Sequence, residues 1–312
     1  MSLVALPAIA LAFFLAGAWI TAAVGYPLFN AAVAQRPGLA RASLLMASVP
    51  VLVGAALALS AFLPGDPHLD RLLGCHCATS MPGWLHLCPL HPTTAPEVLL
   101  PTAAVLFLLV PGRIRALGVL FREPLGTGTG AEPTLVDLPR PMALLAGWLR
   151  PSLLVDRRLW ASLDAQQRQA VLAHERAHLA RRDPLMLATL RLLTSVAPKA
   201  AAHRMMRQWL DRAELRADAA AASQVDPLTI ADALLACARL APASNVLQLG
   251  WTSGSLETRV RALVDLRPGG SHTAGPDAGL VDLIVVAVAL VAGLSRVPWL
   301  HHQVEHLLNL AL

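Results

Sequence analysis

The feature that most constrains the fold of this chain is a charge-free apolar run from Leu3 to Phe29. Such a run is long enough to cross a hydrocarbon core about 30 Å thick. No basic residue precedes it, since the first arginine is Arg36, and it is longer than the apolar core of a signal peptide. The chain is 55% hydrophobic and only 14% charged, whereas soluble domains carry about 25% charged residues. We therefore expect a membrane protein whose first helix is a retained transmembrane span.

Three further apolar segments predict three more spans. They cover residues 43–63, 98–112 and 278–299. The apolar stretch 185–197 is shorter and contains Arg191, so it predicts a buried or interfacial helix.

The distribution of arginine predicts the orientation of these spans. Arginines follow the first and third spans, whereas residues 64–97 contain a single one, Arg71. By the positive-inside rule, residues 1–112 form three spans with an outward-facing loop at 64–97, and residues 113–277 form a cytoplasmic domain. Residues 278–312 then form the fourth span and a short outward-facing tail. The basic charge suits membrane lipid as a partner; we expect no direct nucleic-acid binding, because no basic patch is interleaved with aromatic residues.

The cytoplasmic segment begins with short elements and continues as helix. Residues 125–130 are glycine-rich and predict a flexible linker. Three β-prone pieces, 134–138, 142–146 and 152–155, are separated by prolines and a glycine and predict a small antiparallel hairpin or meander. Asp164, with Gln167 three residues later, predicts the N-cap of a helix that runs to about Arg182, with Pro184 beginning the next element.

That helix carries the sequence His174-Glu175-Arg176-Ala177-His178. Residues four apart lie on one helical face, so the two imidazoles can bind one metal ion, expected to be Zn2+. Glu175 projects beside the metal and is the candidate general base for a bound water.

A third ligand is expected from the segment 212–218. Glu214 can bind the metal, and Asp218, one turn later, can accept a hydrogen bond from the distal nitrogen of a ligating histidine. The alternative is that Glu214 pairs with Arg212, Arg216 or another arginine on a solvated face.

These segments resemble a known family. Residues 163–185, "LDAQQRQAVLAHERAHLARRDPL", are similar to the catalytic segment of the BlaR/MecR-type antirepressor membrane metallopeptidases. Residues 139–156 resemble the lead-in strands of that family, "AELRAD" (213–218) its third-ligand motif and "LETRVRAL" (256–263) its following basic segment. The resemblance implies zinc bound by His174, His178 and Glu214, with Glu175 as the base. It also implies proteolysis of the enzyme itself or of a cytoplasmic winged-helix repressor, in the bacterial inner (cell) membrane.

The chain departs from this family in two respects. About a dozen residues follow Trp299, so we expect no penicillin-binding sensor domain after the last span. Ala217 also stands where the family usually has a cysteine before the aspartate. A donor for the oxyanion is needed as well, and the single tyrosine, Tyr26, lies in the first span. His203, Arg212 and Arg216 are the candidates.

A second cluster of metal-binding or redox-active residues lies in the expected outward-facing loop. It comprises Cys75, His76, Cys77, His86, Cys88 and His91. Two of the cysteines could form a disulfide, for example Cys77–Cys88; a soft-metal or redox sensing site, and no special role, are the alternatives. Residues 302–306 carry an inverted zinc-peptidase pattern, which we interpret as an interfacial amphipathic helix. Cys237 is expected to be a buried small residue.

The sequence thus predicts an α-helical polytopic membrane protein with about four spans and a cytoplasmic α+β zincin-like metallopeptidase domain. The predicted function is zinc-dependent endopeptidase activity in signal transduction, with a homodimer left open. The alternatives are a membrane quality-control metallopeptidase of the HtpX kind and a non-proteolytic metal sensor.

Overall fold

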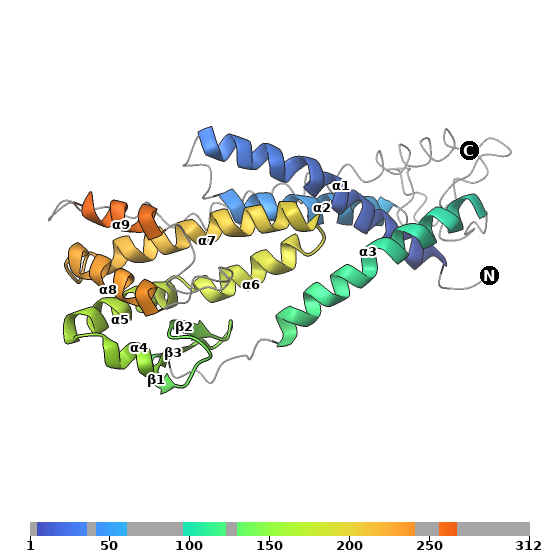
Figure 1. The fold of residues 1–312 in the computed structure, drawn as a ribbon. Coiled ribbons are helices and arrows are strands. Elements are labelled where there is room, and N and C mark those ends of the chain that lie inside the picture. The colour runs from blue at the N-terminus through green and yellow to red at the C-terminus, as the bar shows by residue number, and fades with distance from the viewer. Residues whose placement is uncertain (1–4, 36–41, 61–95, 123–129, 241–255, 267–312) are drawn as a thin grey trace, which may run out of the picture. The chain divides into compact units, whose positions relative to one another are not determined.

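The computed structural model describes residues 5–35, 42–60, 96–122, 130–240 and 256–266. The chain divides into two compact units. The first comprises residues 1–117, 193–202 and 277–312; the second comprises residues 118–192 and 203–276. Each unit is considered by itself below, with the elements labelled as in Figure 1.

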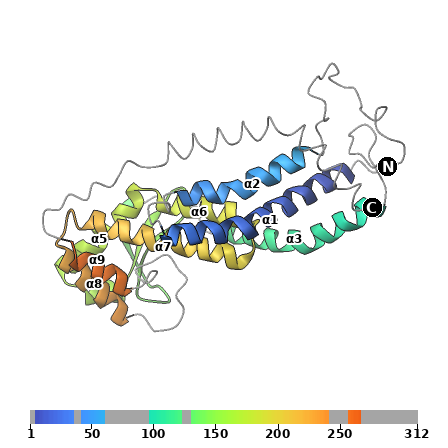
Figure 2. The ribbon, with the colours of Figure 1, turned by 90° about the horizontal axis from the view of Figure 1, so that it is seen from above.

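The first unit contains the long helices α1 (Ala5–Gln35), α2 (Ser43–Ser60) and α3 (Pro96–Arg122). Helices α1 and α2 lie side by side (Figure 2). A Cβ atom placed on Gly54 of α2 would lie 2.5 Å from the carbonyl oxygen of Phe14 in α1, so this close approach requires glycine. The hydroxyl of Tyr26 donates a hydrogen bond to the carbonyl of Ala47 at 3.2 Å, which gives this buried polar group a partner between the two apolar helices.

Residues 193–202, which connect α6 (Asp183–Thr194) to α7 (Lys199–Ala221), also belong to the first unit. Val196 packs with Leu15 and Ala18 of α1, and the Nη2 of Arg113 in α3 donates a hydrogen bond to the carbonyl oxygen of Val196 at 2.6 Å. The predicted helix at 185–197 is therefore present as α6 (Asp183–Thr194), and the chain that follows it is buried among helices.

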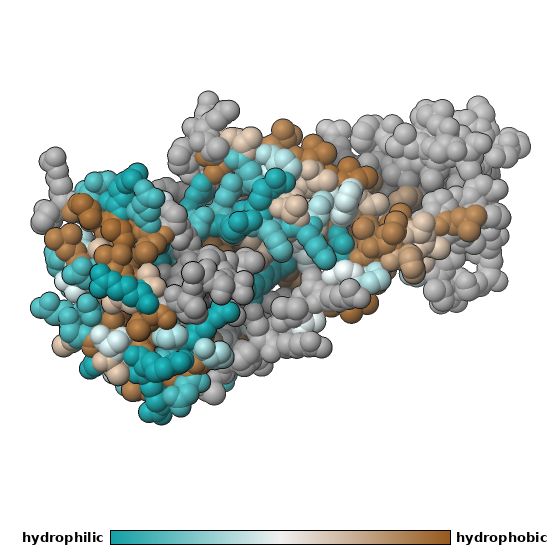
Figure 3. Space-filling view, viewed as in Figure 1, coloured by the Kyte–Doolittle hydropathy of each residue, from teal (hydrophilic) through white to brown (hydrophobic). Residues whose placement is uncertain are grey.

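One helix among the described residues is long and apolar enough to cross a membrane, Pro7–Val33 within α1. By length and composition alone it is suggestive of a membrane anchor. The apolar parts of α2 and α3, Ser43–Leu59 and Thr102–Ile114, are shorter. Large apolar side chains such as Leu28 of α1 and Phe107 of α3 are exposed, and Figure 3 shows hydrophobic residues gathered over these helices. The four-span arrangement stays a prediction. Its fourth span, residues 64–95 of the predicted loop and the tail lie outside the described residues, and Pro96 and Glu97 begin α3.

The second unit contains a three-stranded sheet of β1 (Gly130–Val136), β2 (Ala143–Ala146) and β3 (Ser152–Asp156) in the order β1-β3-β2. Strands β2 and β3 form the expected antiparallel hairpin, with Gly147 in the left-handed region (φ 93°) where β2 ends. The alternative prediction, an antiparallel meander of all three strands, was wrong, because β1 pairs with β3 in parallel. The carboxylate of Asp156, at the end of β3, accepts the N–H of Leu138 just after β1, and this bond holds the two strand ends together. Strand β1 also begins at Gly130, at the end of the segment predicted to be linker.

Asp156 is also the N-cap of the first helix of this unit. Its side chain accepts the backbone N–H groups of Arg158 and Leu159, and so caps α4 (Arg157–Ser162). Helix α5 (Ala165–Ala180) begins with the predicted capping box: Asp164 accepts the N–H of Gln167 at 2.8 Å, and the Gln167 side chain accepts the N–H of Asp164 at 3.1 Å. These two caps fix where the motif-bearing helix starts.

Helices α7 (Lys199–Ala221), α8 (Pro227–Leu240) and α9 (Leu256–Val264) complete the unit. One hydrophobic core joins the sheet, α5, α8 and α9. Its fully buried members include Leu153, Val171, Ile230, Leu234 and Leu263. The predicted burial of Cys237 agrees with the structure, where this residue of α8 is 3% exposed. The core therefore packs against one side of α5, and the histidines on another buried side face Glu214 of α7.

Candidate metal centre

Two histidines of α5 form one side of the candidate site. His174 and His178 are one helical turn apart and are 1% and 7% exposed. Their Nε2 atoms are 3.1 Å apart, with the rings edge to face. Because Val171 and Ala173 of the same helix are buried in the core, the rotation of α5 is fixed, and both imidazoles point to one side of it.

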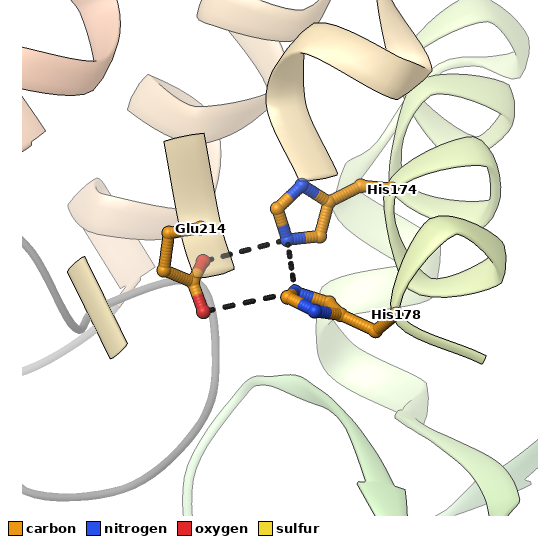
Figure 4. A group of neighbouring side chains, drawn as sticks. All are labelled: His174, His178 and Glu214. Carbon is orange, nitrogen blue, oxygen red and sulfur yellow. Dashed lines mark hydrogen bonds and ion pairs between the residues drawn. The ribbon is translucent and has the colours of Figure 1, made fainter. Parts of the chain in front are cut away.

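Glu214 of α7 forms the opposite side (Figure 4). Its Oε2 is 3.4 Å from the Nε2 of His174, and its Oε1 is 3.7 Å from the Nε2 of His178. One ligand atom from each of the three residues lies within 4.8 Å of the others, and all three side chains are buried. Glu214 is thus directed at the histidine pair and is 1% exposed, so it does not lie on the solvated face that the alternative interpretation proposed. The other part of that alternative, pairing with an arginine, is present, because Arg259 contacts Glu214.

These separations fit a tetrahedral metal. Bond lengths of about 2.0–2.1 Å to nitrogen and oxygen imply ligand–ligand separations of roughly 3.3–3.4 Å at the tetrahedral angle. The three separations in the structure, 3.1, 3.4 and 3.7 Å, bracket this value. Two imidazoles and one carboxylate form a donor set that leaves a fourth position open, as a catalytic site requires.

Each histidine is oriented through its distal nitrogen by a buried carboxylate. The Nδ1 of His174 is 2.9 Å from Oδ1 of Asp218, the residue one turn beyond Glu214. The Nδ1 of His178 is 2.7 Å from Oδ2 of Asp183. Such carboxylate partners fix the tautomer in which Nε2 is the ligand atom. Asp218 lies beside the distal nitrogen of His174, where the sequence predicted a partner, and its role stays a prediction. Asp183 is a partner that the sequence did not predict.

The second residue that the sequence analysis missed is Arg259 of α9, which is 2% exposed. Its Nε and Nη2 donate to the two carboxylate oxygens of Asp218, each at 2.7 Å. Its Nη1 is 2.8 Å from Oε2 of Glu214. One guanidinium therefore contacts both a candidate ligand and the carboxylate behind another ligand.

The charges of the site are strongly coupled. Burial lowers the pKa of His174, but hydrogen bonds to Asp218 and Glu214 outweigh it and raise this pKa to about 9. Burial raises the pKa of Asp218, but hydrogen bonds from Arg259 and His174 outweigh it and lower this pKa to about 2. Without metal, His174 therefore holds a proton at neutral pH, which a bound metal would displace.

The candidate base, Glu175, is buried, whereas two of the three candidate oxyanion donors are exposed. Glu175 is 3% exposed and lies on the same turn of α5 as His174. Of the candidate oxyanion donors, His203 and Arg216 are exposed and Arg212 is half-buried. The six-residue cluster Cys75, His76, Cys77, His86, Cys88 and His91 lies outside the described residues.

The fold and the site together define a metallopeptidase domain: a helix with two histidines one turn apart, a glutamate from a second helix and a buried glutamate beside the first histidine. Residues 130–252 match the model of peptidase family M48, which supports a metallopeptidase of this family over that part of the chain. The match begins at β1 and ends before α9. Comparison with curated proteins and with solved structures gave no match.

Proposed function

We propose that this chain is a membrane-bound zinc endopeptidase that acts in signal transduction and cleaves itself or a cytoplasmic winged-helix repressor. The observation that carries the peptidase part is the buried group of His174, His178 and Glu214, whose ligand atoms lie within 4.8 Å of one another. The family match supports the same class of enzyme. The signalling role and the repressor substrate rest on the sequence resemblance to the antirepressor peptidases.

The chemistry divides between the metal and the chain. Zinc, held by the two Nε2 atoms and the Glu214 carboxylate, would act as a Lewis acid and lower the pKa of a bound water. Glu175 accepts the proton of the attacking water and passes it to the leaving amine. Asp183 and Asp218 hold the imidazoles in the orientation needed for binding.

The first test is the zinc content of the full chain purified in detergent, with Cys75, Cys77 and Cys88 replaced by serine to silence the outer cluster. We expect about one zinc per chain, lost or sharply weakened in His178→Ala and Glu214→Ala. His203→Ala and Glu257→Ala are the matched controls, because both side chains are exposed. A parent without zinc, or zinc that is indifferent to Glu214, would contradict the assignment.

The second test separates a peptidase from a non-proteolytic metal sensor. Glu175→Gln should keep the zinc and lose proteolysis, because the base is removed and the three ligands remain. Loss of a repressor protein on co-expression, in wild type and not in Glu175→Gln, would support the signalling role.

A second candidate function is a membrane quality-control peptidase of the HtpX kind. The family match favours keeping it, because the match is to peptidase family M48 as a whole and not to the antirepressor subfamily. Cleavage of many misfolded membrane proteins would support this candidate, whereas cleavage of a single repressor would support the first.

A further inference from the structure

Arg259 is held in place by the packing of its own helix. Leu263 of α9 is 1% exposed in the hydrophobic core, and Leu256 and Val260 pack against the same core. Arg261, two residues further on, is instead exposed and pairs with Glu257 at 2.7 Å on the outer face. Two arginines of one helix thus occupy opposite environments, and only Arg259 is directed at the candidate metal centre.

The contacts of Arg259 form a three-point clamp. Nε and Nη2 donate hydrogen bonds to the two oxygens of Asp218, and Nη1 forms an ion pair with Oε2 of Glu214 at 2.8 Å. Asp218 Oδ1 also faces His174 Nδ1, and Glu214 Oε2 also faces His174 Nε2. Arg259 is therefore the group that links the ligand on α7 to the orienting carboxylate on the same helix.

We infer that Arg259 is a positioning residue of the metal centre, and that its planar guanidinium orients Glu214 and Asp218 toward the histidine pair. This inference rests on the proposed function. It also extends the functional unit to α9, beyond the residues 130–252 that match the peptidase family.

The geometry points to orientation rather than charge as the contribution of Arg259. A positive charge beside a cation site repels the incoming metal, so charge alone would weaken binding. A guanidinium fixes a carboxylate through parallel N–H groups, and a lysine ammonium lacks that fork. Arg259→Lys therefore keeps the charge and removes the orienting contacts.

The test compares Arg259→Lys with Arg261→Lys in the full chain in detergent, with Cys75, Cys77 and Cys88 replaced by serine. Co2+ is the probe, because its visible absorption reports coordination geometry. Circular dichroism and thermal unfolding of the metal-free proteins report folding. We expect Arg259→Lys to fold, to bind Co2+ about 10–100-fold more weakly and to show an altered spectrum. Arg261→Lys should match the parent in every measurement.

The results separate the inference from the proposed function. Failure of the parent to bind Co2+ or Zn2+ would overturn the metallopeptidase proposal itself. Binding by the parent together with unchanged affinity and spectrum in Arg259→Lys would overturn only the role of Arg259.

If Arg259→Lys does not fold, Arg259→Ala is purified with added methylguanidinium or with methylammonium. Recovery of folding and of the parent Co2+ spectrum with methylguanidinium alone would support the clamp. Recovery with both cations, or with neither, would overturn it.

Discussion

At the scale of single residues, the turn after α5 decides how His178 is oriented. Arg182 has φ 55°, in the left-handed region that side chains other than glycine rarely adopt. This conformation ends α5 and directs the chain back, so that Asp183 is buried with Oδ2 at 2.7 Å from His178 Nδ1. An exposed, strained residue thus places a buried carboxylate behind a candidate ligand.

Replacement of Asp183 is expected to weaken metal binding while the chain stays folded. In Asp183→Ala, His178 loses the acceptor that fixes its tautomer, and the affinity for Zn2+ should fall about 10–100-fold. Asp183→Asn keeps an oxygen acceptor and should lose less. Competition with a chelator of known affinity measures both. Asp137→Ala is the control, because the Asp137 side chain is 87% exposed; equal affinity in Asp183→Ala and the control would disprove the role.

Sequence reasoning could reach some of these residues and not others. The pairs His174/His178 and Glu214/Asp218 each follow from helical spacing, because residues four apart share a face. Bringing the two pairs together followed from the need of zinc for a third ligand and from the family resemblance. Asp183 depends on the backbone conformation of Arg182, which no spacing rule specifies. Arg259 lies 41 residues beyond Asp218, and its contact depends on the packing of α9. The available signal was an arginine on the apolar face formed by Leu256, Val260 and Leu263.

At the scale of elements, Asp156 joins the sheet to α4, the helix that follows β3. Burial raises the pKa of its carboxyl group, but hydrogen bonds from the Arg158 side chain and from the N–H groups of Leu138, Arg158 and Leu159 outweigh it and lower this pKa to about 2. The ionised carboxylate therefore stabilises the ends of β1 and β3 and the start of α4 together.

Asp156→Asn is expected to lower the stability of this unit by about 1–2 kcal/mol at neutral pH, as for loss of a helix cap. The pKa is lowered from an unfolded value of about 3.9, so the charged form is the stabilising one. The difference between wild type and variant should be constant above about pH 5 and should disappear as the pH falls from about 4 to 2. Thermal unfolding in detergent at a series of pH values measures this. A difference that persists undiminished at pH 2 would contradict it.

In the sheet, the positions of the strands were predicted better than the way in which the strands pair. Proline and glycine positions marked where the three strands end, and the β2–β3 hairpin followed from their proximity. Strand β1 instead pairs with β3 in parallel along its length, and the N–H of Leu138, just beyond β1, donates a hydrogen bond to Asp156. Alternation of residue types carries no information about such a contact.

At the scale of the whole molecule, the apolar segments predicted a mostly helical chain, and the described residues are mostly helical with one small sheet. The transmembrane spans were harder to predict, because a helix crosses the membrane only if its apolar segment is about 20 residues long. Among the described helices, α1 meets this requirement, whereas the apolar parts of α2 and α3 are shorter. The orientation of the chain in a membrane therefore rests on the arginine distribution.

The four cysteines provide a direct measurement of that orientation. Cys75, Cys77 and Cys88 lie in the loop 64–97, which the positive-inside rule places outside the cell. Cys237 is buried in α8, and burial, with the nearby charge of Glu175, raises its pKa to about 12, so its reactive thiolate is scarce. A membrane-impermeant maleimide should therefore label the loop cysteines in intact, mildly reduced cells and leave Cys237 unmodified.

The triple serine variant of Cys75, Cys77 and Cys88 is the control for this labelling. It should remain unlabelled in intact and in permeabilised cells, and react once at Cys237 after denaturation. Labelling of the wild-type loop only after permeabilisation would place residues 64–97 inside the cell. The peptidase unit would then face outward, where a cytoplasmic repressor could not be its substrate. The proposed zinc chemistry would stand, because its ligands and their partners all lie within one unit, but the signalling role would have to be replaced by cleavage of extracytoplasmic proteins.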